Sequence, residues 1–179
     1  MPEKHKTGSI TIAALKSVAS LQRCHEFSHA ISILGARDDL EFPFIKAANV
    51  LRLTFDDVGY SSDFGRAAST EDISAIIEFA RSWTGVGNLL IHCKAGTSRS
   101  PATALISVAS IHIPRQSEAL HEILALRNYF RPNSSMLKIA DELLGDGNLV
   151  EATRSHTHPT NPQEVSPATL SLASYFTTG

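Results

Sequence analysis

Short apolar runs alternate with longer amphipathic segments along most of the chain. The apolar runs cover 8–13, 29–34, 49–55 and 88–92, and each ends at polar residues or glycine. Strands that alternate with helices are typical of an α/β domain, because parallel strands need a long crossover between them. We therefore expect one α/β domain with a central, mostly parallel sheet of four to five strands, flanked by helices.

Segments with apolar residues at helical spacing lie between and after these runs. The segment 100–113 is apolar on every side and has a proline in its first turn, so it predicts a buried central helix. The remaining segments each keep a polar face and predict amphipathic helices packed against the sheet. These predicted helices span 15–23, 70–80, 117–129 and 134–144.

The last segment, 153–179, differs in composition from the rest. It is rich in Ser, Thr, Pro, His and Asn, with scattered apolar residues. Such a composition buries too little apolar surface to fold independently, so we expect a tail that is mobile or draped over a domain covering 1–152. His156 and His158 are too few for a metal site, and we expect neither a metal nor a cofactor.

Composition and charge narrow the classes of partner. The 179 residues are 42% hydrophobic and 19% charged, with a formal net charge of -2, which gives no basic footprint for nucleic acid. No segment reaches the roughly 20 apolar residues of a membrane span, and we expect a cytoplasmic protein. The two cysteines, Cys24 and Cys93, show no spacing for a disulfide framework or zinc. We expect Cys24 to be a small, partly buried side chain, with a redox role as the alternative.

The stretch 89–101, LLIHCKAGTSRSP, carries the strongest chemical signal. An apolar strand ends at His92 and Cys93, a polar loop follows, and Arg99 opens the apolar helix. Backbone N–H groups and the positive end of a helix dipole converge at such a junction, which favours a bound anion and an ionised thiol. We expect the loop to ring a phosphate that the planar Arg99 guanidinium clamps. The phosphate-binding residues are expected to be Lys94, Ala95, Gly96, Thr97, Ser98 and Arg99.

The same stretch offers a nucleophile and groups that assist it. A Cys93 thiolate can attack phosphorus and form a phosphocysteine intermediate. The Ser100 hydroxyl can donate to that thiolate and later help it leave, and it can also cap the helix. His92 precedes the nucleophile in a strand and points to the opposite face, so we expect it to orient the loop by hydrogen bonds and not to act as an acid. Because ligands bind beyond the carboxyl ends of parallel strands, Asp57 and Cys93 are expected in one cleft.

The motif His92-Cys93-x5-Arg99-Ser100 resembles the signature of the cysteine-based protein tyrosine phosphatases. Its Ala-Gly-x-Ser-Arg-Ser-Pro form is similar to the compact dual-specificity branch and to small bacterial proteins of that kind. The resemblance is strongest over 49–144 and does not reach the tail. It implies a phosphatase-like catalytic domain over 1–152 that hydrolyses phosphate monoesters, with phosphotyrosine or dual-specificity protein substrates, through a phosphocysteine intermediate.

The resemblance also implies two supporting roles. In that family the general acid is an aspartate on a loop beyond an earlier strand, which corresponds to Asp57 here. Asp63 is the second candidate, and we expect Asp56 to be solvated at the surface. The pair Pro132-Asn133 resembles a Pro-Asn whose asparagine side chain braces the phosphate loop; a simple turn and helix cap is the alternative.

Other functions of this loop stay open. Lys94 is similar to the Cys-Lys-Ala-Gly form of lipid phosphatases, which typically add a second lysine where this chain has Thr97, so phosphoinositide hydrolysis is one alternative. A phosphate- or phosphoprotein-binding module without turnover is another. Sulfur transfer and arsenate reduction use similar loops, but a thiol relay is disfavoured because Cys24 is the one other thiol. The expected ligands are a phosphorylated protein or small aryl phosphate, with phosphate or other oxyanions in the site.

Overall fold

The computed structural model describes residues 8–145, 148–154 and 166–176. Its five strands form one sheet in the order β3-β2-β4-β1-β5. They are β1 (Ser9–Ala14), β2 (His29–Leu34), β3 (Asn49–Thr54), β4 (Asn88–Cys93) and β5 (Ala168–Ser171). Strands β1 to β4 run parallel, and β5 lies antiparallel to β1. The predicted α/β class and mostly parallel sheet are confirmed.

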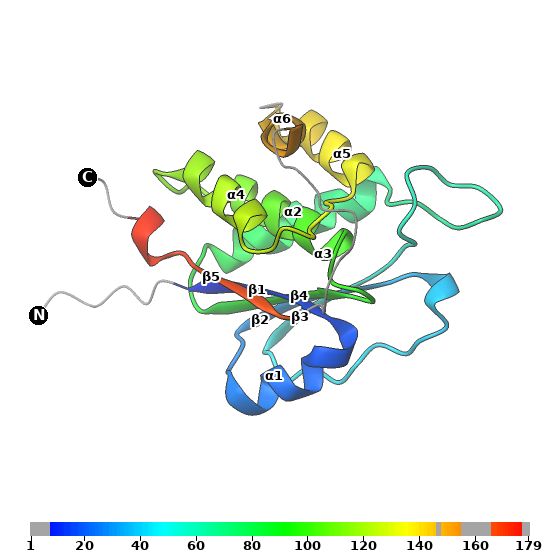
Figure 1. The fold of residues 1–179 in the computed structure, drawn as a ribbon, viewed down its shortest axis with the longest axis horizontal. Helices are drawn as coiled ribbons and strands as arrows, with labels where there is room; N and C mark the ends of the chain where they lie inside the picture. The colour runs from blue at the N-terminus through cyan, green and yellow to red at the C-terminus, as the bar shows by residue number, and fades with distance from the viewer. Residues whose placement is uncertain (1–7, 146–147, 155–165, 177–179) are drawn as a thin grey trace, which may run out of the picture.

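Helices cover the two faces of the sheet unequally (Figure 1). One face carries α1 (Val18–Cys24), which follows the short 3-10 turn η1 (Leu15–Ser17). The opposite face carries α2 (Thr70–Trp83), α3 (Arg99–Ser110), α4 (Gln116–Ala125), α5 (Ser134–Leu144) and α6 (Asn148–Arg154). Two further 3-10 turns, η2 (Ala36–Asp38) and η3 (Ala173–Tyr175), follow β2 and β5. No helix in these described ranges has the length and hydropathy to cross a membrane.

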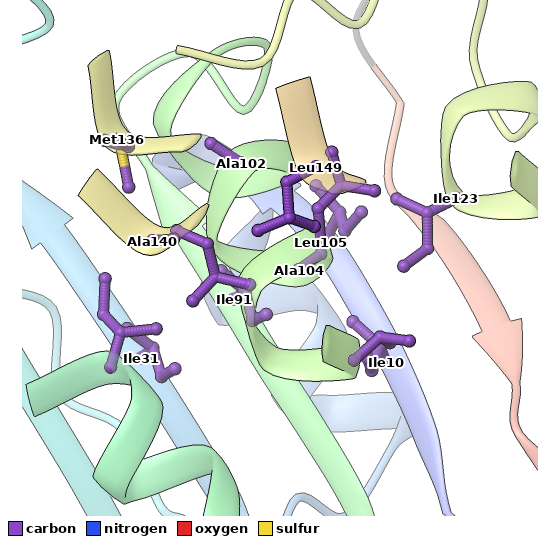
Figure 2. Close-up of a cluster of buried hydrophobic side chains, with 14 of the residues drawn as sticks. Ile10, Ile31, Ile91, Ala102, Ala104, Leu105, Ile123, Met136, Ala140 and Leu149 are labelled. Carbon is purple, nitrogen blue, oxygen red and sulfur yellow. The ribbon is translucent and has the colours of Figure 1, made fainter. Parts of the chain in front are cut away.

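Helix α3 is the centre of the larger helical layer. Every residue of α3 except Ala109 is buried, which confirms the central helix, although the helix ends at Ser110 and not at 113. Small side chains on α3 let it approach the sheet closely, and Figure 2 shows sheet side chains gathered against it. The residues labelled there include Ile10, Ile31 and Ile91 from the sheet, and Ala102, Ala104 and Leu105 from α3.

A second, smaller core lies between the sheet and α1. Its buried members are Ala13, Val18, Ala30, Ile45 and Leu90. The inner strands are therefore covered on both faces, which explains why they are continuous apolar runs without strict alternation.

Part of the expected tail belongs to the sheet. The domain therefore does not end at residue 152, as expected, but includes β5. Helix α6 crosses that boundary, and β5 completes the sheet beside β1. Leu170 is 6% exposed and Leu172 is 0% exposed. The strand is only four residues long, so its alternation of apolar and polar residues is hard to detect within a polar segment. Pairing with β1 buries apolar side chains that an isolated tail would leave in water. His156 and His158 lie outside the described residues.

Candidate active site

The carboxyl end of β4 leads into the loop 93–99 at the middle of the sheet, which is called the phosphate loop after the ligand expected there. Cys93 is 1% exposed, and its Sγ accepts a hydrogen bond from the Gly96 N–H at 3.2 Å. Gly96 has φ +73, and a side chain there would overlap the backbone of Ala13 and Ala14 in β1. The glycine therefore lets the loop turn tightly against β1 and aim an N–H at the thiol.

Arg99 ends this loop, begins α3 and is 4% exposed. Its Nη1 donates to the Phe55 carbonyl at 2.8 Å, and its Nη2 donates to Asp38 Oδ2 at 3.1 Å. Its Nε–H is buried and has no hydrogen-bond partner within the described part of the chain. A buried guanidinium N–H without a partner costs free energy, so this donor indicates a place for an anion.

Ser100 is a second buried group without a partner. Its side chain is 0% exposed, and its Oγ makes no hydrogen bond to any described residue. The N-cap position of α3 is occupied by Ser98, one residue before the helix, so Ser100 does not cap it. Its hydroxyl, in the first turn of α3 directly after Arg99, is thus left available to donate to a ligand or a thiolate.

The His92 side chain is buried and bonds to a neighbouring strand, which differs from the expected role of orienting the loop by hydrogen bonds. Its Nε2 lies 2.6 Å from the Ser32 Oγ on β2, so the hydrogen bond links two strands and not the loop itself. Burial lowers the pKa of His92 to about 4, because the charged imidazolium is poorly solvated there. The ring is therefore neutral at physiological pH and supports the strand that carries Cys93.

Asp38, which was not predicted from the sequence, forms ion pairs with both Arg99 and Lys94. Its Oδ2 accepts from Arg99, while its Oδ1 lies 3.4 Å from the Lys94 Nζ. Burial by itself would raise the pKa of Asp38, but the Gly35 N–H bond and the nearby Arg99 charge outweigh it and hold that pKa below its ordinary value. Asp38 follows β2, the neighbour of β4, so the rule that placed Asp57 in the cleft could have found it.

Asp57 lies exposed at the mouth of the site, where the structure brings it to the phosphate loop. Its Oδ1 accepts a hydrogen bond from the Ser98 Oγ at 2.7 Å and another from the Asn133 Nδ2 at 3.0 Å. Asp63, the second candidate acid, is exposed on the segment between β3 and α2. There its carbonyl oxygen accepts a hydrogen bond from the Arg37 guanidinium.

Asp56 is buried, which corrects the expectation that it is solvated at the surface. It is 7% exposed, and its two carboxylate oxygens accept the N–H groups of Arg37 at 3.1 Å and Arg66 at 2.9 Å. A side chain at Gly35 would overlap this carboxylate, so the chain passes close beside it directly after β2. The backbone bends at Asp57, so Asp56 is held inside by these N–H groups while its neighbour is exposed.

Asn133 makes contacts through both its side chain and its main chain. Its Oδ1 caps α5 by accepting the Met136 N–H at 3.1 Å, while its Nδ2 reaches Asp57. The contact with the phosphate loop comes from its main-chain N–H, which donates to the Ser98 carbonyl at 3.3 Å. The expected cap is therefore present, and the loop is braced by the asparagine backbone and not by its side chain.

The remaining loop residues and the second cysteine occupy different surroundings. Lys94 and Ala95 are exposed, and Thr97 is half-buried with its carbonyl accepting from the Arg131 N–H at 2.8 Å. Cys24 is exposed, not partly buried, and ends α1 near the start of β2, at the edge of the sheet opposite Cys93. Among the described residues, no cluster of His, Cys, Asp or Glu is arranged to hold a metal ion.

No protein-family profile matches the chain, and no curated protein matches it in sequence. Solved structures match it in fold. PTPMT1 in complex with PI(5)P is 16% identical, with 75% of this chain and 87% of that chain covered and a TM-score of 0.53. DUSP15 is 22% identical, with 83% and 91% covered and a TM-score of 0.53. Human DUSP28 is 12% identical, with 78% and 93% covered and a TM-score of 0.55.

This chain shares its fold with these phosphatases. The matches extend beyond the loop motif, because they cover most of the described chain and most of each phosphatase chain. The α/β architecture that the His-Cys-x5-Arg-Ser motif implied is therefore the one that the structure has.

Proposed function

We propose that this chain is a phosphatase that hydrolyses phosphate monoesters, with phosphotyrosine in proteins as its preferred substrate, through a phosphocysteine intermediate on Cys93. The observation that carries the proposal is the buried Arg99 Nε–H, which has no partner among the described residues. Arg99 ends a loop that begins at a buried thiol, and that thiol already receives an N–H. An oxyanion would satisfy the Arg99 donor and bring phosphorus within reach of the sulfur.

The first step transfers the phosphoryl group to the enzyme. The Cys93 thiolate forms an S–P bond as the bond between phosphorus and the leaving oxygen breaks. Asp57, at the mouth, gives its proton to that oxygen, so the alcohol leaves neutral and the aspartate becomes a carboxylate. Loop N–H groups and the Arg99 guanidinium hold the equatorial oxygens while charge shifts across them.

The second step releases phosphate. The Asp57 carboxylate takes a proton from water, and the water oxygen attacks phosphorus. The S–P bond breaks with its electron pair returning to Cys93, and the buried Ser100 hydroxyl donates to the thiolate as it leaves. The site then holds inorganic phosphate, a thiolate and a protonated Asp57, as at the start.

The depth of the thiol supports an aryl substrate. Cys93 is 1% exposed, whereas Asp57 is exposed at the mouth. The segment after Asp57 carries two aromatic side chains, Tyr60 at 77% and Phe64 at 76% exposed, which can pack against an aromatic ring. A phosphotyrosine spans more of this depth than a phosphoserine does.

The surroundings of Lys94 help to decide between a phosphoprotein and a phosphoinositide substrate. The PTPMT1 neighbour was solved in complex with PI(5)P. In this chain, however, the Lys94 ammonium is directed to Asp38, and Thr97 stands where a second lysine would add positive charge. These contacts favour a phosphoprotein over a phosphoinositide.

Hydrolysis of an aryl phosphate by the wild type and by Cys93→Ser tests the proposal. We expect turnover by the wild type, loss of turnover in the variant, and retained phosphate binding in both. Phosphotyrosine, phosphoserine and phosphothreonine peptides and short-chain PI(5)P are then compared by kcat/KM, with phosphotyrosine expected to be highest. A wild type that binds phosphate without turnover would be a binding module and would overturn the proposal.

A further inference from the structure

We propose that Ser98 and Asn133 are positioning residues for the general acid. They hold Asp57 by one carboxylate oxygen, Oδ1, so that Oδ2 carries the proton given to the leaving group. The inference rests on the proposed function, since it takes Asp57 as the acid of that reaction.

Ser98 occupies the N-cap position of α3, where a serine side chain ordinarily caps the helix. Serine is favoured there because its oxygen accepts an N–H from the first turn. In this chain the Ser98 side chain makes no such cap bond. It instead donates to Asp57 Oδ1 at 2.7 Å, so the hydroxyl serves the carboxylate and not the helix.

Asn133 has its amide orientation fixed by a separate contact. Its Oδ1 accepts the Met136 N–H at 3.1 Å in capping α5, so its Nδ2 must point the other way. That nitrogen donates to Asp57 Oδ1 at 3.0 Å. The cap therefore holds a donor in place without help from Asp57.

The two donors are also tied to each other. The Asn133 N–H donates to the Ser98 carbonyl at 3.3 Å, and the Arg131 N–H donates to the neighbouring Thr97 carbonyl at 2.8 Å. Ser98 directly precedes Arg99 in the phosphate loop. The acid is thus fixed to the element that holds the phosphate, which keeps the distance between the acid and the leaving oxygen constant.

The choice of oxygen follows from the hydrogen bonds. Oδ1 accepts two donors, whereas Oδ2 makes no hydrogen bond to any described residue. A proton on Oδ1 would compete with both donors, so the protonated acid carries it on Oδ2. As the Oδ2–H bond breaks, its electron pair stays on the carboxylate, and the two donors at Oδ1 stabilise the charge that develops.

Two variants remove one donor each and leave the helix caps in place. Ser98→Ala removes the hydroxyl, which caps nothing, and Asn133→Ser keeps an oxygen that can cap α5 but loses the amide donor. We measure kcat/KM, which reports on the first step and not on hydrolysis of the intermediate, for aryl phosphates with increasingly basic leaving groups. For the most basic group, kcat/KM should fall roughly ten- to hundredfold, the worth of a hydrogen bond to a charged group. For the most acidic group, which needs no proton, kcat/KM should stay within about twofold.

The controls separate positioning from structural damage. The inhibition constant of orthovanadate should be unchanged in both variants, Ser98→Thr should restore kcat/KM for the most basic leaving group, and Ser82→Ala at the C-terminal end of α2 should behave as the wild type. Equal slowing for every leaving group, or a parallel change in vanadate inhibition, would overturn the inference while leaving the proposed function standing. A wild type without turnover would instead remove the proposed function itself.

Discussion

The Nη2 of Arg99 donates to the Oδ2 of Asp38 at 3.1 Å, in a pair where the arginine side chain is 4% exposed. Breaking one partner of a buried ion pair leaves the other charge uncompensated. Asp38 therefore engages Nη2 and leaves the Nε–H for the anion that we propose, and it also balances the arginine charge.

Replacing Asp38 tests that balance. We expect Asp38→Asn to lower the free energy of unfolding by about 3 kcal/mol, because Arg99 loses its buried counter-charge. Inorganic phosphate supplies a negative charge at the same place, so it should raise the melting temperature of the variant more than that of the wild type. Asp39→Asn is the matched control, since Asp39 is exposed and has the left-handed φ that asparagine tolerates. Identical phosphate effects in variant and wild type would contradict this role.

Replacing Asp57 identifies the acid. We expect Asp57→Asn to reduce kcat by about 10²- to 10⁴-fold for poor leaving groups and to flatten the alkaline limb of the pH profile, because no proton is then supplied. Asp63→Asn, the matched change on the same segment, should leave both unchanged. A normal profile in the first variant with a flattened one in the second would move the acid to Asp63.

The buried imidazole of His92 predicts a pH dependence of stability. Its folded pKa of about 4 lies below the ordinary 6.5, so between these values the unfolded chain binds more protons than the folded one. Stability is therefore complete above pH 6.5 and falls by about 3 kcal/mol as the pH drops to 4. Burial also lowers the pKa of His29, which acts in the same direction.

Urea unfolding at pH 7 and pH 4.5 measures this loss. The free energy of unfolding of His92→Asn should differ much less between the two pH values than that of the wild type. His112→Asn, at an exposed position, should show the same difference as the wild type. Asp38 and Asp72, whose pKa values are lowered, contribute only as the pH falls below their ordinary value of 3.8. An unchanged pH dependence in His92→Asn would show that this histidine is not its source.

The buried C-terminal segment predicts a stability effect far from the site. Leu172 is 0% exposed, and its N–H donates to the Gly8 carbonyl at 2.9 Å. We expect Leu172→Ala to lower the free energy of unfolding by about 2–5 kcal/mol, from lost burial and the cavity left behind. Leu143→Ala, at a site that is 42% exposed, is the control and should cost much less. Equal urea midpoints for Leu172→Ala and wild type would contradict the docking of this segment.

The strands and the phosphate loop could be predicted because their signals are local. Continuous apolar runs mark strands buried on both faces, and Cys93 and Arg99 lie in one short stretch with a glycine between them. The fold of the domain followed from the alternation of strands with helices. Asp57 could also be placed, since it directly follows a strand whose carboxyl end meets the others.

The features that the sequence did not predict depend on contacts between segments that lie far apart in the chain. Asp38 looks like part of a polar turn until β2 is known to lie beside β4, where the carboxylate meets Arg99. The strand β5 gains its stability from pairing with β1, at the other end of the chain. The burial of Asp56 depends on backbone N–H groups from two separate segments, which no local pattern reveals.

The proposed reaction passes through a covalent phosphoryl group on Cys93, and intact-protein mass spectrometry of enzyme quenched during turnover tests for it most directly. With saturating phosphotyrosine peptide, we expect one added phosphoryl group on the wild type, mapped by proteolysis to Cys93 and absent from Cys93→Ser. Phosphate release by the wild type with an unmodified Cys93 at every quench time, or a phosphoryl group on another residue, would contradict it.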